Sequence, residues 1–214
     1  MEFVLIVPML LLSLAAHEFA HAWVALREGD HTAQRLGRVT LNPLPHIDLF
    51  GTILIPAILL ATRSGFLIGW AKPVPVDPQN FRHGGRSDLK VAIAGITANL
   101  LLAMALTLTM VALVYARRAW PAASPLRSLE VMVGAGISLN FLLAVFNLLP
   151  VPPLDGARVL YRLLPARMAA AYLRLHGVAI VVFFALFLSG MMSWVLWPAS
   201  LLERLSQLLI QWWT

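Results

Sequence analysis

The opening apolar stretch of the chain carries the feature that most constrains its fold. Residues 17–21 read His-Glu-Phe-Ala-His, inside an apolar run that begins at Met1. Histidines four residues apart share one face of a helix, so both imidazoles can reach one metal ion. Glu18 can then take a proton from water at that ion. A charged group at mid-bilayer costs about 2.5–3.5 kcal/mol on insertion scales, so partners or a function must offset this placement.

The composition predicts an integral membrane protein with one domain, residues 1–214. The chain is 60% hydrophobic and 12% charged, whereas soluble domains average about 25% charged residues. The net charge of +6 is therefore interpreted as a record of membrane topology and not as a nucleic-acid signal. The chain contains no cysteine, so a metal ion must be held by His, Asp or Glu.

The hydrophobic pattern predicts an all-α polytopic fold with few other elements. Four apolar stretches are long enough to cross a bilayer, at about residues 2–26, 89–116, 129–149 and 176–198. A shorter apolar block at 49–62, which contains Pro56, has the length of a re-entrant segment. Residues 36–41 alternate like a short β-strand or hairpin, and residues 201–213 are amphipathic like an interfacial helix.

The distribution of basic residues favours a re-entrant block over a fifth crossing. If the block returns to its own side, 12 of the 16 Lys and Arg residues lie inside; if it crosses, only 7 do. The positive-inside rule favours the first arrangement. The 12 residues are Arg27, Arg35, Arg38, Arg63, Lys72, Arg82, Arg86, Lys90, Arg158, Arg162, Arg167 and Arg174.

This topology bears on the third metal ligand. Two histidines leave a tetrahedral catalytic zinc one protein ligand short. The re-entrant topology returns Pro150–Gly156 to the membrane face at which the first helix ends. Asp155 is the favoured ligand because it follows a helix broken by prolines, where the chain can turn its carboxylate inward. Asp48, at the start of the re-entrant block, is the competing candidate.

Five segments of the chain form a recognisable set: HEFAH at 17–21, AGITAN at 94–99, NLLPVPPLDG at 147–156, LNPLPHID at 41–48 and GWAKPVP at 69–75. With these segments the chain resembles the site-2 protease family of intramembrane zinc metalloproteases (peptidase M50), in its compact form without PDZ or CBS domains. The resemblance covers most of the chain, and Ala157 is a mild departure, because many members have glycine there.

The resemblance implies a function and a set of site residues. His17, His21 and Asp155 would hold one Zn²⁺, with Glu18 as the catalytic base. The substrate would be a transmembrane protein segment cut within or near the bilayer. Substrate binding would involve Asn99, Asn147 and the strand residues Arg38, Val39 and Thr40, although Asn99 could instead join two helices. We expect a multi-pass protein of a prokaryotic cell membrane with its site toward the cytoplasm. The alternative is an inactive membrane scaffold or metal carrier.

Overall fold

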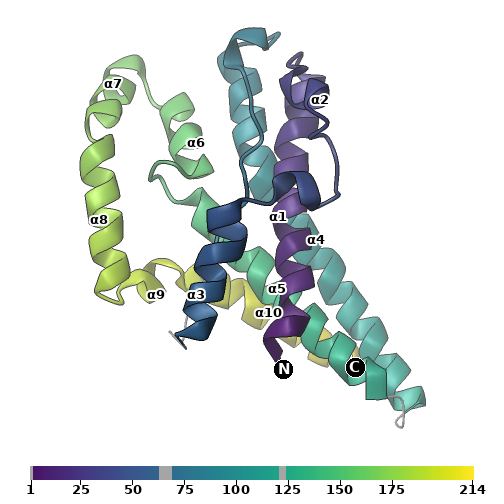
Figure 1. The fold of residues 1–214 in the computed structure, drawn as a ribbon. Helices are drawn as coiled ribbons and strands as arrows, with labels where there is room; N and C mark the ends of the chain where they lie inside the picture. The colour runs from purple at the N-terminus through teal and green to yellow at the C-terminus, as the bar shows by residue number, and fades with distance from the viewer. Residues whose placement is uncertain (1, 63–68, 121–123) are drawn as a thin grey trace. The chain divides into compact units, whose positions relative to one another are not determined.

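The computed structural model describes residues 2–62, 69–120 and 124–214, which are mostly helical (Figure 1). The α-helices are α1 (Glu2–Arg27), α2 (Thr32–Arg35), α3 (Ile55–Ala61), α4 (Gly85–Ala119), α5 (Ser124–Leu148), α6 (Asp155–Leu163), α7 (Ala166–Arg174), α8 (His176–Leu188), α9 (Met192–Val195) and α10 (Trp197–Trp213). Shorter helical segments are η1 (Leu44–His46), the π-helical η2 (Leu49–Leu54) and η3 (Pro78–Asn80).

Two compact units share the two long helices α1 and α4. Unit 1 consists of Met1–Ser13 and Ile96–Thr214, and unit 2 consists of Leu14–Gly95. Each helix passes from one unit into the other without a break in its helical structure. A single domain over residues 1–214 stays a prediction.

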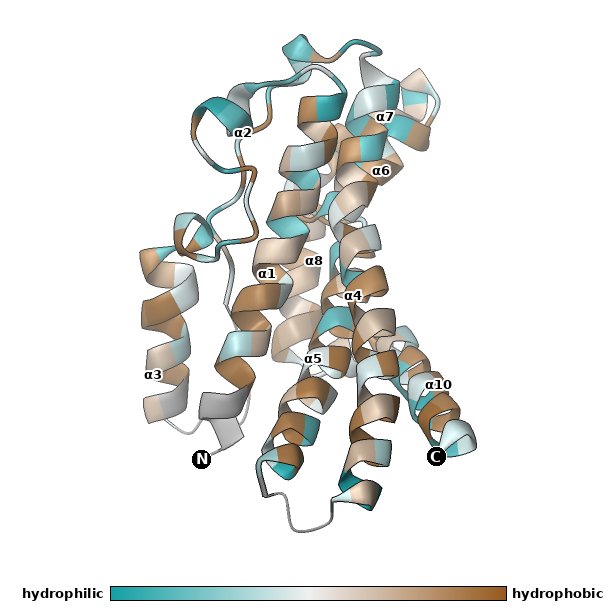
Figure 2. Ribbon diagram, turned by 90° about the vertical axis from the view of Figure 1, so that its right-hand side faces the viewer, coloured by the Kyte–Doolittle hydropathy of each residue, from teal (hydrophilic) through white to brown (hydrophobic). Residues whose placement is uncertain are grey.

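Three of the described helices are long and apolar enough to cross a membrane: Ile6–Arg27, Gly85–Ala119 and Pro125–Leu148. They correspond to the first three predicted spans. Figure 2 shows hydrophobic residues along α4 and α5, and mostly hydrophilic residues around α2. On α4, Leu101, Met104 and Leu108 are 59–72% exposed. Large apolar side chains exposed on a long apolar helix fit contact with lipid.

The fourth predicted span, 176–198, is not one helix. Gly190 adopts a φ of +75°, a left-handed conformation that ends α8 two residues earlier and favours glycine. The chain then forms the short helix α9 before α10 begins. A fourth crossing is available only if Ala166–Arg174 and Gly177–Leu188, which bend by 59°, together make one broken span.

Unit 1 is organised around packing between α4, α5 and α10. Its core contains buried residues from all three helices: Ala103, Leu106, Val133, Ile137, Phe141 and Ala199. Ser138 Oγ of α5 also donates to Glu203 Oε1 of α10 at 2.6 Å. The predicted C-terminal helix at 201–213 is therefore present as α10, and its place at the membrane interface stays a prediction.

Unit 2 packs the second half of α1 against its own loops. Ala22 of α1, Ala33 and Val74 form one buried cluster. Ala25 of α1 belongs to a second cluster with Phe81 and Val91. The residues of these clusters on α1 are small, so the extended chain after residue 69 can lie close to the helix.

The predicted strand at 36–41 is not confirmed, because these residues form turns and bends and no strand occurs among the described residues. Gly37, at φ +65°, instead ends α2. Its N–H donates to Gln34 O, and the Arg38 N–H donates to Ala33 O, both at 2.9 Å. This pair of bonds is a Schellman motif, which turns the chain where the alternation had predicted extended backbone.

The apolar block at 49–62 begins with η2 and continues as α3. Its apolar helical part, Leu49–Leu59, is shorter than a membrane span. Asp48 caps this helix by accepting from the N–H groups of Phe50 at 3.0 Å and Gly51 at 2.7 Å. The return of the block to its own membrane face stays a prediction.

Candidate metal centre

The two histidines of the motif converge on one point beside α1. His17 and His21 are 7% and 8% exposed, and their Nε2 atoms lie 3.0 Å apart. In a tetrahedral zinc site with Zn–N distances of about 2.0–2.1 Å, two nitrogen ligands lie about 3.3 Å apart. The imidazole pair therefore already has nearly the spacing that one metal ion requires.

A backbone carbonyl sets the tautomer of His21. His21 Nδ1 lies 2.7 Å from Val91 O of α4. A carbonyl can only accept, so Nδ1 carries the proton and Nε2 presents its lone pair. Ligand histidines in metalloproteins are commonly oriented by such a second hydrogen bond.

Gly95 of α4 provides the room for both rings. It lies one helical turn after Val91 on the same helix. A Cβ at Gly95 would lie 2.6 Å from His17 Nε2 and closer still to His21 Nε2. Glycine at this position therefore leaves space for both nitrogens, which a Cβ would displace.

Glu18 is held by the chain after residue 69. Its Oε2 accepts a hydrogen bond from the Val74 backbone N–H at 2.7 Å. Pro73 and Pro75 flank Val74. The glutamate of the motif is thus oriented by an amide that lies 56 residues away in the sequence.

Asp155, in unit 1, opens α6 after the proline-rich end of α5. The helix α5 ends at Leu148, before Pro150, and α6 begins at Asp155 itself. Gly156 is buried, and a Cβ there would clash with the carbonyl oxygens of Leu148 and Leu149. Glycine therefore allows the chain to fold back closely on the end of α5 and present the Asp155 carboxylate.

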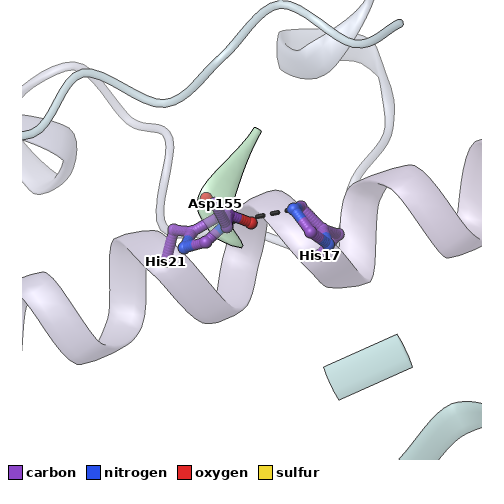
Figure 3. A group of neighbouring side chains, drawn as sticks. All are labelled: His17, His21 and Asp155. Atoms are coloured by element: carbon purple, nitrogen blue, oxygen red, sulfur yellow. Dashed lines mark hydrogen bonds between the residues drawn. The ribbon is translucent and has the colours of Figure 1, made fainter. Parts of the chain in front are cut away.

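His17 and His21 lie on α1 in unit 2, whereas Asp155 belongs to unit 1; Figure 3 labels the three side chains. Asp155 as the third metal ligand stays a prediction. Two imidazoles and one carboxylate match the donor set of catalytic zinc sites. The competing candidate, Asp48, caps η2.

Asn99, predicted to bind substrate, lies in a fully buried polar network of unit 1. Asn99 Nδ2 donates to Asn140 Oδ1 at 2.8 Å and to Ser13 O at 3.3 Å. Asn140 Nδ2 donates to Ser13 Oγ at 2.8 Å and to Gly136 O at 2.8 Å. The network joins α1, α4 and α5, which agrees with the alternative interpretation of Asn99 as a helix contact.

The other predicted substrate residues also make internal contacts. Asn147 Nδ2 donates to Leu143 O of its own helix at 2.9 Å. Arg38 is buried and bonded to backbone carbonyls. Val39 packs against the cluster of Ala22, Ala33 and Val74, and Thr40 O lies 3.0 Å from His46 Nε2. Substrate binding by these residues stays a prediction.

Sequence reasoning missed several of the residues that make these contacts, among them Asn140 and Val74. The interhelical contact of Asn140 could have been predicted, because an uncharged polar residue inside a long apolar helix generally has a partner. Val74 contributes only its backbone amide, so its side chain carries no signal. The prolines on both sides of Val74 indicate an extended conformation but do not indicate what the amide between them contacts.

Comparison with known proteins agrees with this chemistry. Residues 122–190 match the family described as "Peptidase family M50". The chain is 40% identical over 189 residues to "Putative zinc metalloprotease YwhC" of Bacillus subtilis (strain 168), covering 88% of this chain and 82% of that relative. It is 35% identical over 158 residues to "Putative zinc metalloprotease Rip2" of Mycolicibacterium smegmatis, covering 72% of this chain and 55% of the relative. The Rip2 protein of Mycobacterium tuberculosis (strain H37Rv) is 32% identical over 191 residues, covering 87% and 68%. No solved structure matches the chain.

Proposed function

The chain belongs to peptidase family M50, and from this premise we propose that it is an intramembrane zinc endopeptidase. It would hydrolyse peptide bonds within or near transmembrane segments of other membrane proteins. The observation that carries the proposal is the convergence of the His17 and His21 Nε2 atoms, 3.0 Å apart, in an apolar helix that also carries Glu18. Buried polar groups in such a helix are costly and generally mark a functional site.

Zinc would be held by His17, His21 and Asp155, because imidazole nitrogens and a carboxylate oxygen are the ligand types of catalytic zinc sites. The names of the relatives YwhC and Rip2 specify zinc. A zinc ion at this position would supply a Lewis acid that polarises the substrate carbonyl and acidifies water. Val91 O would keep His21 in the tautomer that leaves Nε2 available.

Glu18 would act as the general base and then as the general acid. It directly follows His17, the position that the base occupies in the H-E-x-x-H pattern. It would accept a proton from the attacking water and return it to the leaving amine nitrogen. The hydrogen bond from Val74 N–H would keep Oε2 in place during both transfers. Because a carboxylate oxygen must lie within about 3 Å of the heavy atom that carries the proton, this fixed orientation favours the reaction.

The substrate would have to unwind before cleavage. The carbonyl groups of a transmembrane helix are already hydrogen-bonded within the helix. Extended backbone at membrane depth is tolerated only where protein or a wet cavity surrounds it. The segment whose Val74 N–H contacts Glu18 is non-helical, since residues 69–77 form neither helix nor strand. We therefore place the unwound substrate segment beside this part of unit 2.

We also propose that the site faces the cytoplasm. The support is the charge distribution, because the topology with 12 of the 16 basic residues on one side puts the C-terminal end of α1 on that side. His17 and His21 lie in the C-terminal half of α1. The substrate would thus be cut near the cytoplasmic half of the bilayer.

The proposal is tested with purified wild type and Glu18→Gln. Both are loaded with zinc, their zinc content is measured by mass spectrometry, and each is incubated with a single-span test substrate. We expect the wild type to cut the span. The variant should keep its zinc and cleave about 100- to 10,000-fold more slowly, because a general base typically accelerates a reaction by this factor.

Glu28→Gln is the matched control, because it makes the same chemical change just after α1, at a residue paired with Lys90. It should cleave at the wild-type rate. Undiminished cleavage by Glu18→Gln would refute the mechanism. Zinc binding without cleavage by the wild type would instead favour the scaffold or metal carrier.

A further inference from the structure

The extended segment 72–76 lies against the face of α1 that carries Glu18. The Val74 side chain is 9% exposed and packs with Ala22, one helical turn after Glu18, and with Ala33. This packing places the Val74 backbone beside the glutamate. Its N–H then donates to Glu18 Oε2 at 2.7 Å.

Two prolines isolate this amide. Pro73 and Pro75 have no backbone N–H, so Val74 supplies the single main-chain donor of the three residues. A residue that precedes proline is also restricted to extended conformations. The donor therefore sits on a stiff stretch of chain that offers no alternative N–H to Glu18.

Arg38 holds the other end of the same peptide group. The peptide between Pro73 and Val74 is trans, because the one cis bond in the described chain is Pro152–Pro153. Its carbonyl oxygen, Pro73 O, accepts from Arg38 Nη1 at 3.0 Å, and its N–H donates to Glu18. A peptide group is planar, with C=O and N–H pointing in opposite directions, so a contact that fixes the carbonyl also fixes the N–H.

The side chain of Arg38 is itself held in place by further contacts. It is 8% exposed. Its Nη2 donates to Pro45 O at 2.6 Å and to Lys72 O at 3.0 Å. The planar guanidinium thus connects the Pro45 turn to two successive carbonyls of the segment, which the single ammonium of lysine could not match.

We propose that Arg38 is a positioning residue that orients the Glu18 carboxylate through the Pro73–Val74 peptide group. The guanidinium polarises the carbonyl, which strengthens the N–H as a donor to the carboxylate. This inference rests on the proposed function, in which Glu18 is the base. It gives Arg38 a role different from the substrate contact that the sequence predicted.

The first test removes the N–H itself. Val74→Pro deletes the donor, and Val74→Ala keeps it, while both lose the packing of the valine side chain. Hydrogen bonds to charged groups contribute about 1.5–3 kcal/mol, so kcat of Val74→Pro should be roughly 10- to 100-fold below that of Val74→Ala. KM and zinc content should agree within about twofold. Equal kcat values for the two variants would overturn the proposal.

The second test removes the anchor. Arg38→Gln should lower kcat about 10-fold or more without raising KM, and Arg38→Lys should restore part of the loss. The control is Asp30→Asn, which loosens the same segment at its far end, where Asp30 Oδ2 accepts from the Asp77 N–H at 2.7 Å. It should lower stability but keep the wild-type kcat. A rise in KM with unchanged kcat for Arg38→Gln would make Arg38 a substrate contact and overturn the proposal.

Hydrogen exchange provides a test that needs no activity. Within Pro73–Pro75 the Val74 amide is the single exchangeable site, so its deuterium uptake reports this bond directly. Uptake should be slow in the wild type and at least 10-fold faster in both Glu18→Ala and Arg38→Gln. If Glu18→Ala leaves the uptake unchanged, the orientation proposal fails even if the enzyme cleaves. If the wild type does not cleave but the exchange pattern is as expected, the proposed function fails and the orientation of Glu18 stands.

Discussion

Replacing Gly95 by alanine should strongly weaken zinc binding without disturbing the helices. The added Cβ would lie 2.6 Å from His17 Nε2, whereas ordinary van der Waals contact begins at 3.4 Å. The His17 Nε2 atom would therefore have to move by about 0.8 Å (3.4 minus 2.6), and zinc sites tolerate only about 0.2 Å in ligand distance. The His21 ring would have to move further.

We expect zinc affinity to fall by at least about 100-fold, or about 2.7 kcal/mol. The assay is competition with a chelator of known affinity, with zinc content measured on the purified protein and helix content measured by circular dichroism. Alanine favours a helix over glycine by roughly 0.5–1 kcal/mol, so the helix α4 itself should persist. The effect is local to the two imidazoles.

Gly134→Ala is the matched control on α5. A Cβ there would meet its nearest neighbour, Met110 Cε, at 3.5 Å, which is an ordinary contact. This variant should bind zinc as the wild type does and unfold at the same or a slightly higher temperature. If Gly95→Ala bound zinc with wild-type stoichiometry and affinity, the metal would not lie between His17 and His21, and the proposed centre would be wrong.

Three further predictions concern other parts of the chain. Asp155→Ala should lower zinc occupancy in the same competition assay, and unchanged zinc content would instead point to Asp48 as the ligand. Asn140→Leu removes the partner of Asn99 Nδ2 and of Ser13 Oγ. At about 0.6 kcal/mol for each interhelical hydrogen bond, the free energy of unfolding measured by denaturant titration should fall by roughly 1 kcal/mol. An unchanged free energy of unfolding would contradict the network. Burial raises the pKa of Asp30, but hydrogen bonds from Thr32, Asp77 N–H and Asn80 outweigh it and hold the pKa below its usual range. The stability that Asp30 contributes should therefore be complete above about pH 4 and lost as the pH falls further. Between pH 6 and 3, the unfolding temperature of Asp30→Asn should not show the part of the acid destabilisation that Asp30 causes in the wild type.

Local patterns determined the helices and the histidine pair. The positions of α1, α4 and α5 follow from runs of apolar residues, because a helix in lipid needs no information beyond its own length and hydropathy. The convergence of His17 and His21 follows from the helical repeat alone. Where a single glycine interrupts the pattern, the same reasoning failed: Gly190 divides the predicted span at 176–198, and Gly37 turns the chain where a strand was expected.

Contacts between distant residues were decided by the tertiary structure. The amide of Val74 reaches Glu18 across 56 residues, and Arg38 reaches Pro73 across 35. Backbone groups are the same at every residue, so the amino-acid sequence does not identify which carbonyl or amide will meet a given side chain. Gly95 is a similar case, because glycine in a helix is compatible with many neighbours, and only the packing of α4 on α1 shows that two imidazoles occupy the space. The sequence alone therefore determined the chemistry of the motif, and the fold decided which backbone groups orient it.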